Sequence, residues 1–249
     1  MKDKTIAVWF SCGIASAVAA KKTVEIYGDK NTVRVLNSPV AEEDLDNRRF
    51  LHDVEEWIGQ KIEIVTNPAY PDNSADSVWR KRKYMSGIAG APCTLELKKK
   101  PRQLWEKENH VDYHVLGFVA EERDRHERFV RNERDNVLPV LIDLNISKPE
   151  AAQIVVEAGI KPPRVYDWGY ANGNCIGCPK GNSPTYWNLV RKTHPEVFEA
   201  RAKLSREVGA RLVRVKGERI FLDELDPNEE GAPIKSMQSE CGLFCEESE

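Results

Sequence analysis

Strands alternate with helices over the first part of the chain, and this order constrains the fold more than any other feature. Residues 5–10 and 32–37 are short apolar runs, and the segment between them, residues 14–28, has helical spacing. A second helical segment at 46–59 precedes a third apolar run at 61–67. Because this alternation calls for crossover connections, it predicts an α/β fold with a parallel sheet covered by helices on both faces.

The rest of the chain continues the sheet and then changes character. Helices are expected at 74–85, 95–108, 148–159 and 184–208, strands at 111–119 and 137–144, and a hairpin at 210–225 around Lys216 and Gly217. A chain of 249 residues with 41% hydrophobic residues can bury one sizeable core. We therefore expect a main domain at 1–180 and a C-terminal helical and hairpin extension at 181–249.

Composition excludes some classes of protein. The net charge of -3 does not supply the broad basic field of a protein that coats nucleic acid. The first apolar run is far shorter than the roughly 20 residues that span a bilayer, so a cytoplasmic protein without a membrane anchor is expected. In a reducing cytosol, the six cysteines are metal ligands, redox groups or core residues rather than structural disulfides.

The loop between the first strand and the first helix is the expected anion site. In an open parallel sheet, ligands bind beyond the carboxyl ends of the strands. Gly13 lets the backbone approach an anion, while Ser11, Ser16 and the helix N-terminus offer hydroxyl and N–H donors. Spacing alone is equally consistent with a tight packing turn.

The segment FSCGIASAVAA at residues 10–20 resembles the modified phosphate loop, S-x-G-x-x-S, of the adenine nucleotide α-hydrolase (PP-loop) superfamily. This group includes the ATP pyrophosphatases and the sulfonucleotide (PAPS) reductases. The resemblance implies a Rossmann-like (HUP-type) fold and an adenine nucleotide, PAPS, APS or ATP. The implied nucleotide-binding residues of the loop are Ser11, Cys12, Gly13, Ile14, Ala15 and Ser16. Ala15 replaces the pyrophosphatase Asp, which favours simple binding; Mg²⁺ is needed only if ATP is cleaved.

Two further segments resemble reductase motifs. CTLELKKKP, from Cys93, is similar to C-C-x-x-x-K-x-x-P, and the resemblance implies that Lys98 holds a sulfate or phosphate. GFVAEERDRHER is similar to G-x-R-x-E-Q-S-x-x-R, which implies nucleotide contacts from Gly117, Glu121 and Arg125. A charged helix with paired signs explains the same acidic and basic residues without a ligand.

Cys175 and Cys178 form a C-I-G-C motif in a glycine-rich loop. From spacing alone, the pair is a zinc half-site, a redox pair or two ligands of an iron–sulfur cluster. The preceding residues resemble the stretch before the cluster cysteines of adenylylsulfate reductases, which implies a 4Fe-4S cluster. Cys93 would be a third ligand and Cys245 a fourth; three-cysteine clusters occur in the ATP-dependent tRNA thiolation enzymes of the same superfamily.

The tail segment SECGLFCEE resembles the E-C-G-x-H segment of sulfonucleotide reductases. The resemblance implies catalytic roles for Glu240 and Cys241, with the Cys241 thiolate attacking the substrate sulfur and thioredoxin or glutaredoxin releasing the product. Cys245 would then resolve the intermediate or ligate the cluster.

Three functions follow as expectations. The first is a thiol-dependent reductase that converts an adenylylated sulfate to sulfite. The second is an ATP-dependent iron–sulfur sulfurtransferase acting on tRNA or DNA, and the third is a non-catalytic nucleotide-binding subunit. The added segment at 184–225 is similar to that of PAPS-reductase-like proteins of phages and mobile elements. The sequence is also compatible with a homo-oligomer.

Overall fold

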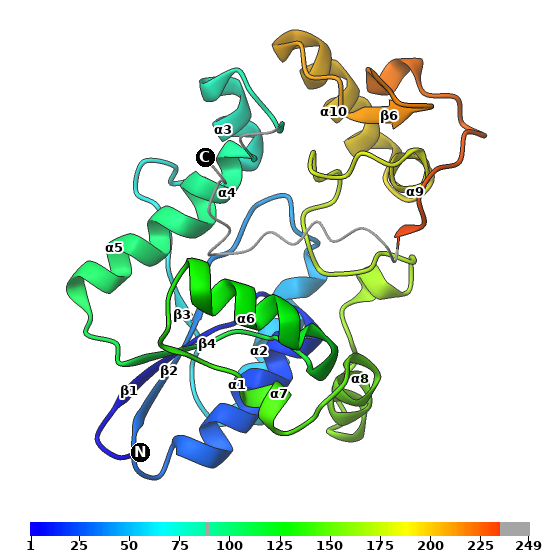
Figure 1. The fold of residues 1–249 in the computed structure, drawn as a ribbon. Coiled ribbons are helices and arrows are strands. Elements are labelled where there is room, and N and C mark those ends of the chain that lie inside the picture. The colour runs from blue at the N-terminus through cyan, green and yellow to red at the C-terminus, as the bar shows by residue number, and fades with distance from the viewer. Residues whose placement is uncertain (88–89, 235–249) are drawn as a thin grey trace. The chain divides into compact units, whose positions relative to one another are not determined.

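The computed structural model describes residues 1–87 and 90–234 (Figure 1). It divides the chain into two compact units that exchange segments. The first unit comprises Met1–Pro39, Leu45–Val65 and Arg102–Arg164, and the second comprises Val40–Asp44, Thr66–Pro101 and Val165–Glu249. This division differs from the predicted one at residue 180, because residues 66–101 and 165–180 belong to the same unit as the C-terminal extension.

A five-stranded parallel sheet forms the centre of the first unit and confirms the predicted α/β fold. Its strand order is β3-β2-β1-β4-β5, and all four pairings are parallel. The strands are β1 (Thr5–Trp9), β2 (Thr32–Asn37), β3 (Glu63–Ile64), β4 (Tyr113–Val115) and β5 (Val137–Leu138). The chain builds outward from β1 to β3 and then returns to the other side of β1, so the connection direction reverses at β1.

Alternating residues of the strands pack against helices on opposite faces of the sheet. Ile6 and Val8 of β1 belong to the core of the first unit together with residues of α1, α2, α7 and α8. Trp9 points to the other face, where the centre of its ring lies 5.8 Å from the centre of the Trp105 ring in α5. The helices of this unit are α1 (Ile14–Tyr27), α2 (Asp46–Ile58), α6 (Arg123–Asn132), α7 (Val140–Asp143) and α8 (Lys148–Glu157), together with α5 (Lys100–Glu108) from Arg102 onward. The predicted helical cover on both faces is therefore confirmed.

The predicted strand at 137–144 was wrong in its second half. Only Val137 and Leu138 pair with β4, and the chain then turns into α7. Pro139 between them has no N–H to donate to a sheet ladder, which ends the strand. The prediction failed because a short apolar run fits a buried strand and a buried helix equally well.

The second unit has its own apolar core and contains the elements predicted near the C-terminus. The helical pair α9 (Pro184–Thr193) and α10 (Pro195–Val208) is followed by the hairpin strands β6 (Val213–Val215) and β7 (Glu218–Ile220). Lys216 and Gly217 both have positive φ, 49° and 92°, as a two-residue hairpin turn requires. No helix among the described residues is long and apolar enough to cross a membrane.

The helical segment before α5 changes its winding in the middle. After α3 (Ala75–Arg82), a short α4 (Pro92–Thr94) leads into a π-helical turn at Leu95–Lys99. The N–H of Lys100 bonds to the carbonyl of Leu95, five residues back. Pro101 follows and cannot donate to the carbonyl four residues before it, so wider winding here avoids a regular turn that the proline would break.

Candidate functional site

The loop Ser11–Ser16 lies where the sheet topology favours ligand binding. It follows the carboxyl end of β1, and β1 is the strand at which the order of connections reverses. Strands on the two sides of such a switch point send their following loops in opposite directions, which opens a crevice at the carboxyl edge. The fold of the first unit therefore places the predicted nucleotide loop at the position where α/β sheets bind ligands.

Hydroxyl groups hold this loop in shape. Ser16, which is 5% exposed, accepts the N–H of Ser11 at 3.1 Å and donates to the carbonyl of Gly13 at 2.9 Å. Cys12 has φ 56°, in the left-handed region, and the Asn37 amide lies 3.6 Å from its sulfur. The same amide donates to the carbonyl of Phe10 at 2.8 Å. Two short polar side chains thus fix the path of the backbone between β1 and α1.

The N-terminus of α1 carries no carboxylate that would compete with an anion. Gly13 occupies the N-cap position without a side-chain hydrogen bond, and the first turn contains no acidic residue. The positive end of the helix dipole favours a negative group here. Ala15, which is in this turn, supplies no ligand for Mg²⁺.

Gly117 lies directly against the same turn. It follows β4, and a Cβ placed on it would come within 2.8 Å of the Ser16 nitrogen and 3.0 Å of the Ala15 carbonyl carbon. The approach of 2.8 Å is closer than Cβ atoms in proteins essentially ever come to another atom, so the backbone would have to shift. The close approach therefore requires glycine at 117, and the structure brings together two of the predicted nucleotide-site segments.

Glu121 and Arg125 have protein partners in the structure. The Glu121 carboxylate accepts the backbone N–H of Lys148, the first residue of α8, at 3.2 Å. Arg125 donates to Glu122 at 2.6 Å, and its guanidinium lies 5.3 Å from the centre of the Phe118 ring. These contacts account for the positions of the Glu121 and Arg125 side chains within the first unit. A contact of either side chain with a nucleotide stays a prediction.

In the second unit, Lys98 is buried and paired. Its Nζ lies 2.8 Å from Oε1 of Glu43, and the two side chains are 7% and 10% exposed. Glu43 belongs to the five-residue segment Val40–Asp44 that this unit takes from the N-terminal half of the chain. Sequence reasoning missed Glu43, because its partner is 55 residues away and no local pattern connects them.

Three of the predicted metal ligands contribute to one apolar cluster of the second unit. Cys178 is buried in this cluster, and Cys93 and Cys175 pack against it as partly buried residues. The loop that carries Cys175 and Cys178 is held at Ile176, whose N–H donates to the carbonyl of Glu42 at 3.0 Å. The fold therefore brings the Cys93 segment and the C-I-G-C loop into the same core.

These residues do not by themselves form a metal site. Within residues 1–87 and 90–234, no group of three or more His, Cys, Asp or Glu side chains is placed to hold a metal ion. The fourth predicted ligand, Cys245, and the predicted catalytic residues Glu240 and Cys241 lie outside the described residues. The cluster stays a prediction that iron analysis can test.

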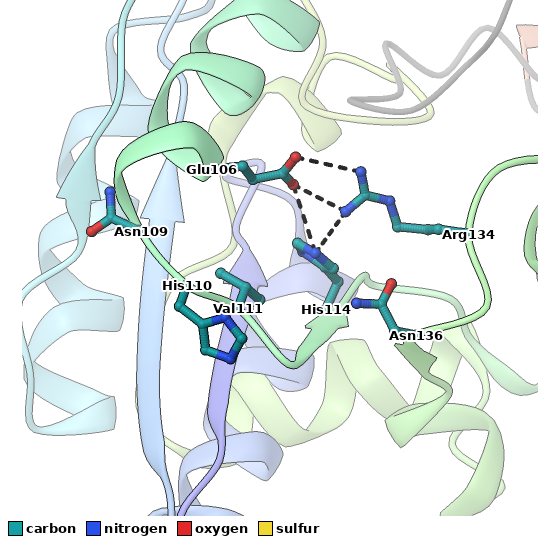
Figure 2. Close-up of a pocket in the computed structure, with 7 residues that line it drawn as sticks. All are labelled: Glu106, Asn109, His110, Val111, His114, Arg134 and Asn136. Carbon is teal, nitrogen blue, oxygen red and sulfur yellow. Dashed lines mark hydrogen bonds and ion pairs between the residues drawn. The ribbon is translucent and has the colours of Figure 1, made fainter.

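A polar cavity of about 280 Å³, which the sequence analysis did not predict, opens in the first unit (Figure 2). His114, Arg134 and Glu106 converge in it, and Arg134 lies 2.6 Å from Nε2 of His114 and 3.0 Å from Glu106. Behind the ring, the indole N–H of Trp9 donates to Nδ1 of His114 at 3.0 Å. An indole N–H is only a donor, so Nδ1 of His114 accepts this hydrogen bond and carries no proton.

This environment predicts a loss of stability in mild acid. Burial, followed by the charge of Arg134, lowers the pKa of His114 from 6.5 to about 4. Between these values the unfolded chain binds a proton that the folded chain does not, so stability falls as pH falls from 6.5 toward 4. From pH 7 to pH 5, we expect His114 to reduce the free energy of unfolding by about 2 kcal/mol.

Urea unfolding at pH 7 and pH 5 measures this difference. His114→Gln should reduce the pH-dependent loss by about that amount, whatever its own effect at pH 7. His110→Gln, at a neighbouring side chain that is 81% exposed, should leave the loss unchanged. An equal loss in wild type and His114→Gln would contradict the prediction.

Comparison with known proteins gives structural likenesses at low identity. No family model and no curated protein matches the chain. The chain is similar to a phosphoadenylyl-sulfate (PAPS) reductase from Candida auris, with 13% identity and a TM-score of 0.47 over 68% of this chain and 80% of that one. It is also similar to the U34-tRNA thiolase NcsA from Methanococcus maripaludis, solved with its [4Fe-4S] cluster, with 12% identity and a TM-score of 0.49 over 98% and 84%.

Likenesses at these identities and TM-scores do not carry the activity of either protein over to this chain. The arguments about function therefore depend on its own residues: the braced loop at the switch point of the sheet, Gly117 against that loop, and the thiols gathered in the second unit. On this basis the chain is an α/β protein with a five-stranded parallel sheet, similar in structure to a PAPS reductase and to a tRNA thiolase.

Proposed function

We propose that this protein binds an adenine nucleotide at the loop Ser11–Ser16 and is a thiol-dependent reductase of an adenylylated sulfate. The observation that supports it most is the geometry of that loop. The loop follows the strand at the topological switch point, its helix has no acidic first turn, and Gly117 leaves no side chain beside it. These features suit a phosphate group.

The chemistry of the proposal uses cysteine as a nucleophile. The Cys241 thiolate attacks the sulfur of the adenylylated sulfate, and the bond from sulfur to the phosphate oxygen breaks to release the nucleotide. The product on the protein is a Cys–S–SO₃⁻ group. A thiol of thioredoxin or glutaredoxin then attacks the Cys241 sulfur and releases sulfite, and the second thiol of that dithiol resolves the mixed disulfide, so the dithiol supplies two electrons.

The absence of a carboxylate in the first turn of α1 favours the reductase over an enzyme that cleaves ATP. A metal-assisted attack on ATP needs Mg²⁺ beside the phosphates, and carboxylates are its usual protein ligands. Ala15 provides none, and no residue of this turn is acidic. A nucleotide that arrives already activated needs no such ligand.

A sulfurtransferase that modifies tRNA or DNA is the second candidate. It is favoured by the position of Cys93, Cys175 and Cys178 in a single apolar cluster, because three thiols can carry a cluster with an open iron position. The described residues do not complete such a site, so this candidate requires iron to be demonstrated directly.

One set of assays separates the candidates. Protein purified without oxygen is analysed for iron and sulfide, then incubated with APS or PAPS and reduced thioredoxin. Sulfite release that is lost in Cys241→Ser, with nucleotide binding retained, supports the reductase. Pyrophosphate release from ATP that tRNA or DNA stimulates would move the sulfurtransferase to first place. Nucleotide binding without either reaction would identify a binding subunit.

Ser16 provides a test of the nucleotide loop itself. Replacing it with alanine removes the acceptor for the Ser11 N–H and the donor to the Gly13 carbonyl, so we expect the Kd for adenine nucleotides to rise by about tenfold. Thr23→Val is the matched control, because Thr23 carries a buried hydroxyl on the same helix, and this hydroxyl donates to the carbonyl of Ala19 at 2.6 Å. Calorimetric titration that gives equal Kd values for the two variants would contradict this site.

A further inference from the structure

The loop that carries Cys175 and Cys178 has no regular secondary structure, so its backbone depends on partners elsewhere. Gly181 N–H bonds back to the carbonyl of Cys178 at 3.0 Å, and Ile176 N–H bonds to Glu42. The N–H of Cys178 itself donates to a side chain, the phenol oxygen of Tyr186, at 2.7 Å. A buried backbone N–H without an acceptor costs about 1–3 kcal/mol. The phenol oxygen therefore favours the backbone position in which the Cys178 N–H can reach it.

Helix α9 holds the loop at two points through consecutive residues. Tyr186 accepts the Cys178 amide, and the indole of Trp187 donates to the carbonyl of Gly181 at 2.7 Å. Trp187 is fully buried and Tyr186 is 6% exposed. Both contacts come from the first turn of α9, which starts with Pro184 at the position where the helix tolerates it. Helix α9 therefore holds the loop at Cys178 and again three residues later at Gly181.

Helix α10 packs against Gly177, one of the two residues between Cys175 and Cys178. Gly177 has φ 69°, and a Cβ on it would lie 3.0 Å from Val197 Cγ1 and 3.2 Å from Arg201 Cγ. The segment 184–225, which the reductase resemblance does not account for, thus supplies contacts to the loop from both of its helices.

The phenol has hydrogen-bonding capacity beyond the contact with Cys178. Among the described residues no acceptor is recorded for its own O–H, although the residue is more than nine-tenths buried. Burial, followed by the neighbouring Cys178 thiol, raises the pKa of Tyr186 well above its usual value of 10.

We infer that Tyr186 is the positioning residue of the cysteine loop: its phenol oxygen accepts the backbone N–H of Cys178 and so fixes the backbone at that thiol. This role rests on the proposal that Cys175 and Cys178, with Cys93, hold an iron–sulfur cluster. Under that proposal the helices α9 and α10 support the cysteine loop, and Tyr186 is the residue that contacts the backbone of Cys178.

Tyr186→Phe tests the inference without removing the ring. The variant deletes the acceptor of one amide, so hydrogen exchange at Cys178 should become at least about tenfold faster. Alkylation of Cys178 by iodoacetamide, followed by peptide mass spectrometry, should also become several-fold faster. Both measurements are made on the full-length protein without any cofactor.

Tyr170→Phe is the control for a structural effect. Tyr170 lies in the same cluster with its ring 6.2 Å from that of Tyr186, but its hydroxyl bonds to Thr193 at 2.9 Å rather than to the loop. It should change neither rate by more than about twofold. Equal rates in wild type and Tyr186→Phe, or equal acceleration in both variants, would overturn the inference.

Iron content separates this inference from the function on which it rests. If wild-type protein reconstituted without oxygen binds iron, Tyr186→Phe should bind less than half as much, while Tyr170→Phe should match wild type. Wild-type protein without iron would argue against the cluster, yet faster exchange at Cys178 in Tyr186→Phe would still support the positioning role. Undiminished iron in Tyr186→Phe would count against it.

Discussion

Replacing Gly117 with alanine is expected to lower the free energy of unfolding by about 3 kcal/mol and to abolish measurable nucleotide binding. The added Cβ would lie 2.8 Å from the Ser16 nitrogen and 3.0 Å from both the Ala15 carbonyl carbon and Ser16 Cα. All three atoms belong to the backbone of α1, so no side chain can rotate away to make room. Either β4 or the first turn of α1 must move, and that turn is the proposed phosphate site.

Gly159→Ala is the matched control for the general effect of replacing a glycine. Gly159 has φ 75°, but a Cβ on it would meet no heavy atom within 4 Å in the part of the chain that the structure describes, its chain neighbours aside. It should cost about 1 kcal/mol through backbone strain and leave nucleotide affinity unchanged. Urea unfolding and calorimetric titration of both variants measure the two effects. A Gly117→Ala variant as stable as Gly159→Ala, with wild-type affinity, would show that the loop is not confined as described.

The first unit could be predicted well because its signals are local. The apolar runs, the helix ending near Gly28 and the small residues at 11–16 lie close together in sequence, and the parallel sheet follows from their alternation. The capped start of α8 was also predictable, since Ser147 and Glu150 form a capping box within four residues. Local spacing was sufficient where structure is built from neighbouring residues.

The partners of the candidate site could not be predicted, because they come from distant segments. Glu43 and Lys98 form an ion pair although they are 55 residues apart in the sequence, and Trp9 and His114 form a hydrogen bond although they are 105 residues apart. The division into two units also could not be read from the sequence. Residues Val40–Asp44 belong to the second unit, although in the sequence they lie between β2 and β3 of the first unit. Sequence patterns identify side chains that can ionise, but only the fold determines which ones are buried together.

Breaking the pair between Glu43 and Lys98 should have the largest effect in the second unit. Glu43→Leu keeps approximately the volume of the side chain but removes the carboxylate 2.8 Å from a buried ammonium. Loss of one partner of a buried ion pair costs about 4 kcal/mol, because the remaining charge has been taken out of water. Urea unfolding should show this loss. Glu207→Leu, which removes an exposed partner of Arg80, should cost less than about 1 kcal/mol.

The double variant Glu43→Leu/Lys98→Met then separates the stability role of Lys98 from its predicted contact with sulfate. The double variant contains neither charge of the buried pair. Most of the stability that is lost in Glu43→Leu should therefore return. If Lys98 holds the sulfate of the substrate, the double variant should bind PAPS at least about tenfold more weakly than the wild type does, while its affinity for AMP stays at the wild-type value. Equal losses for both nucleotides, or none for PAPS, would mean that the buried pair serves the fold of the second unit and that the sulfate is bound elsewhere.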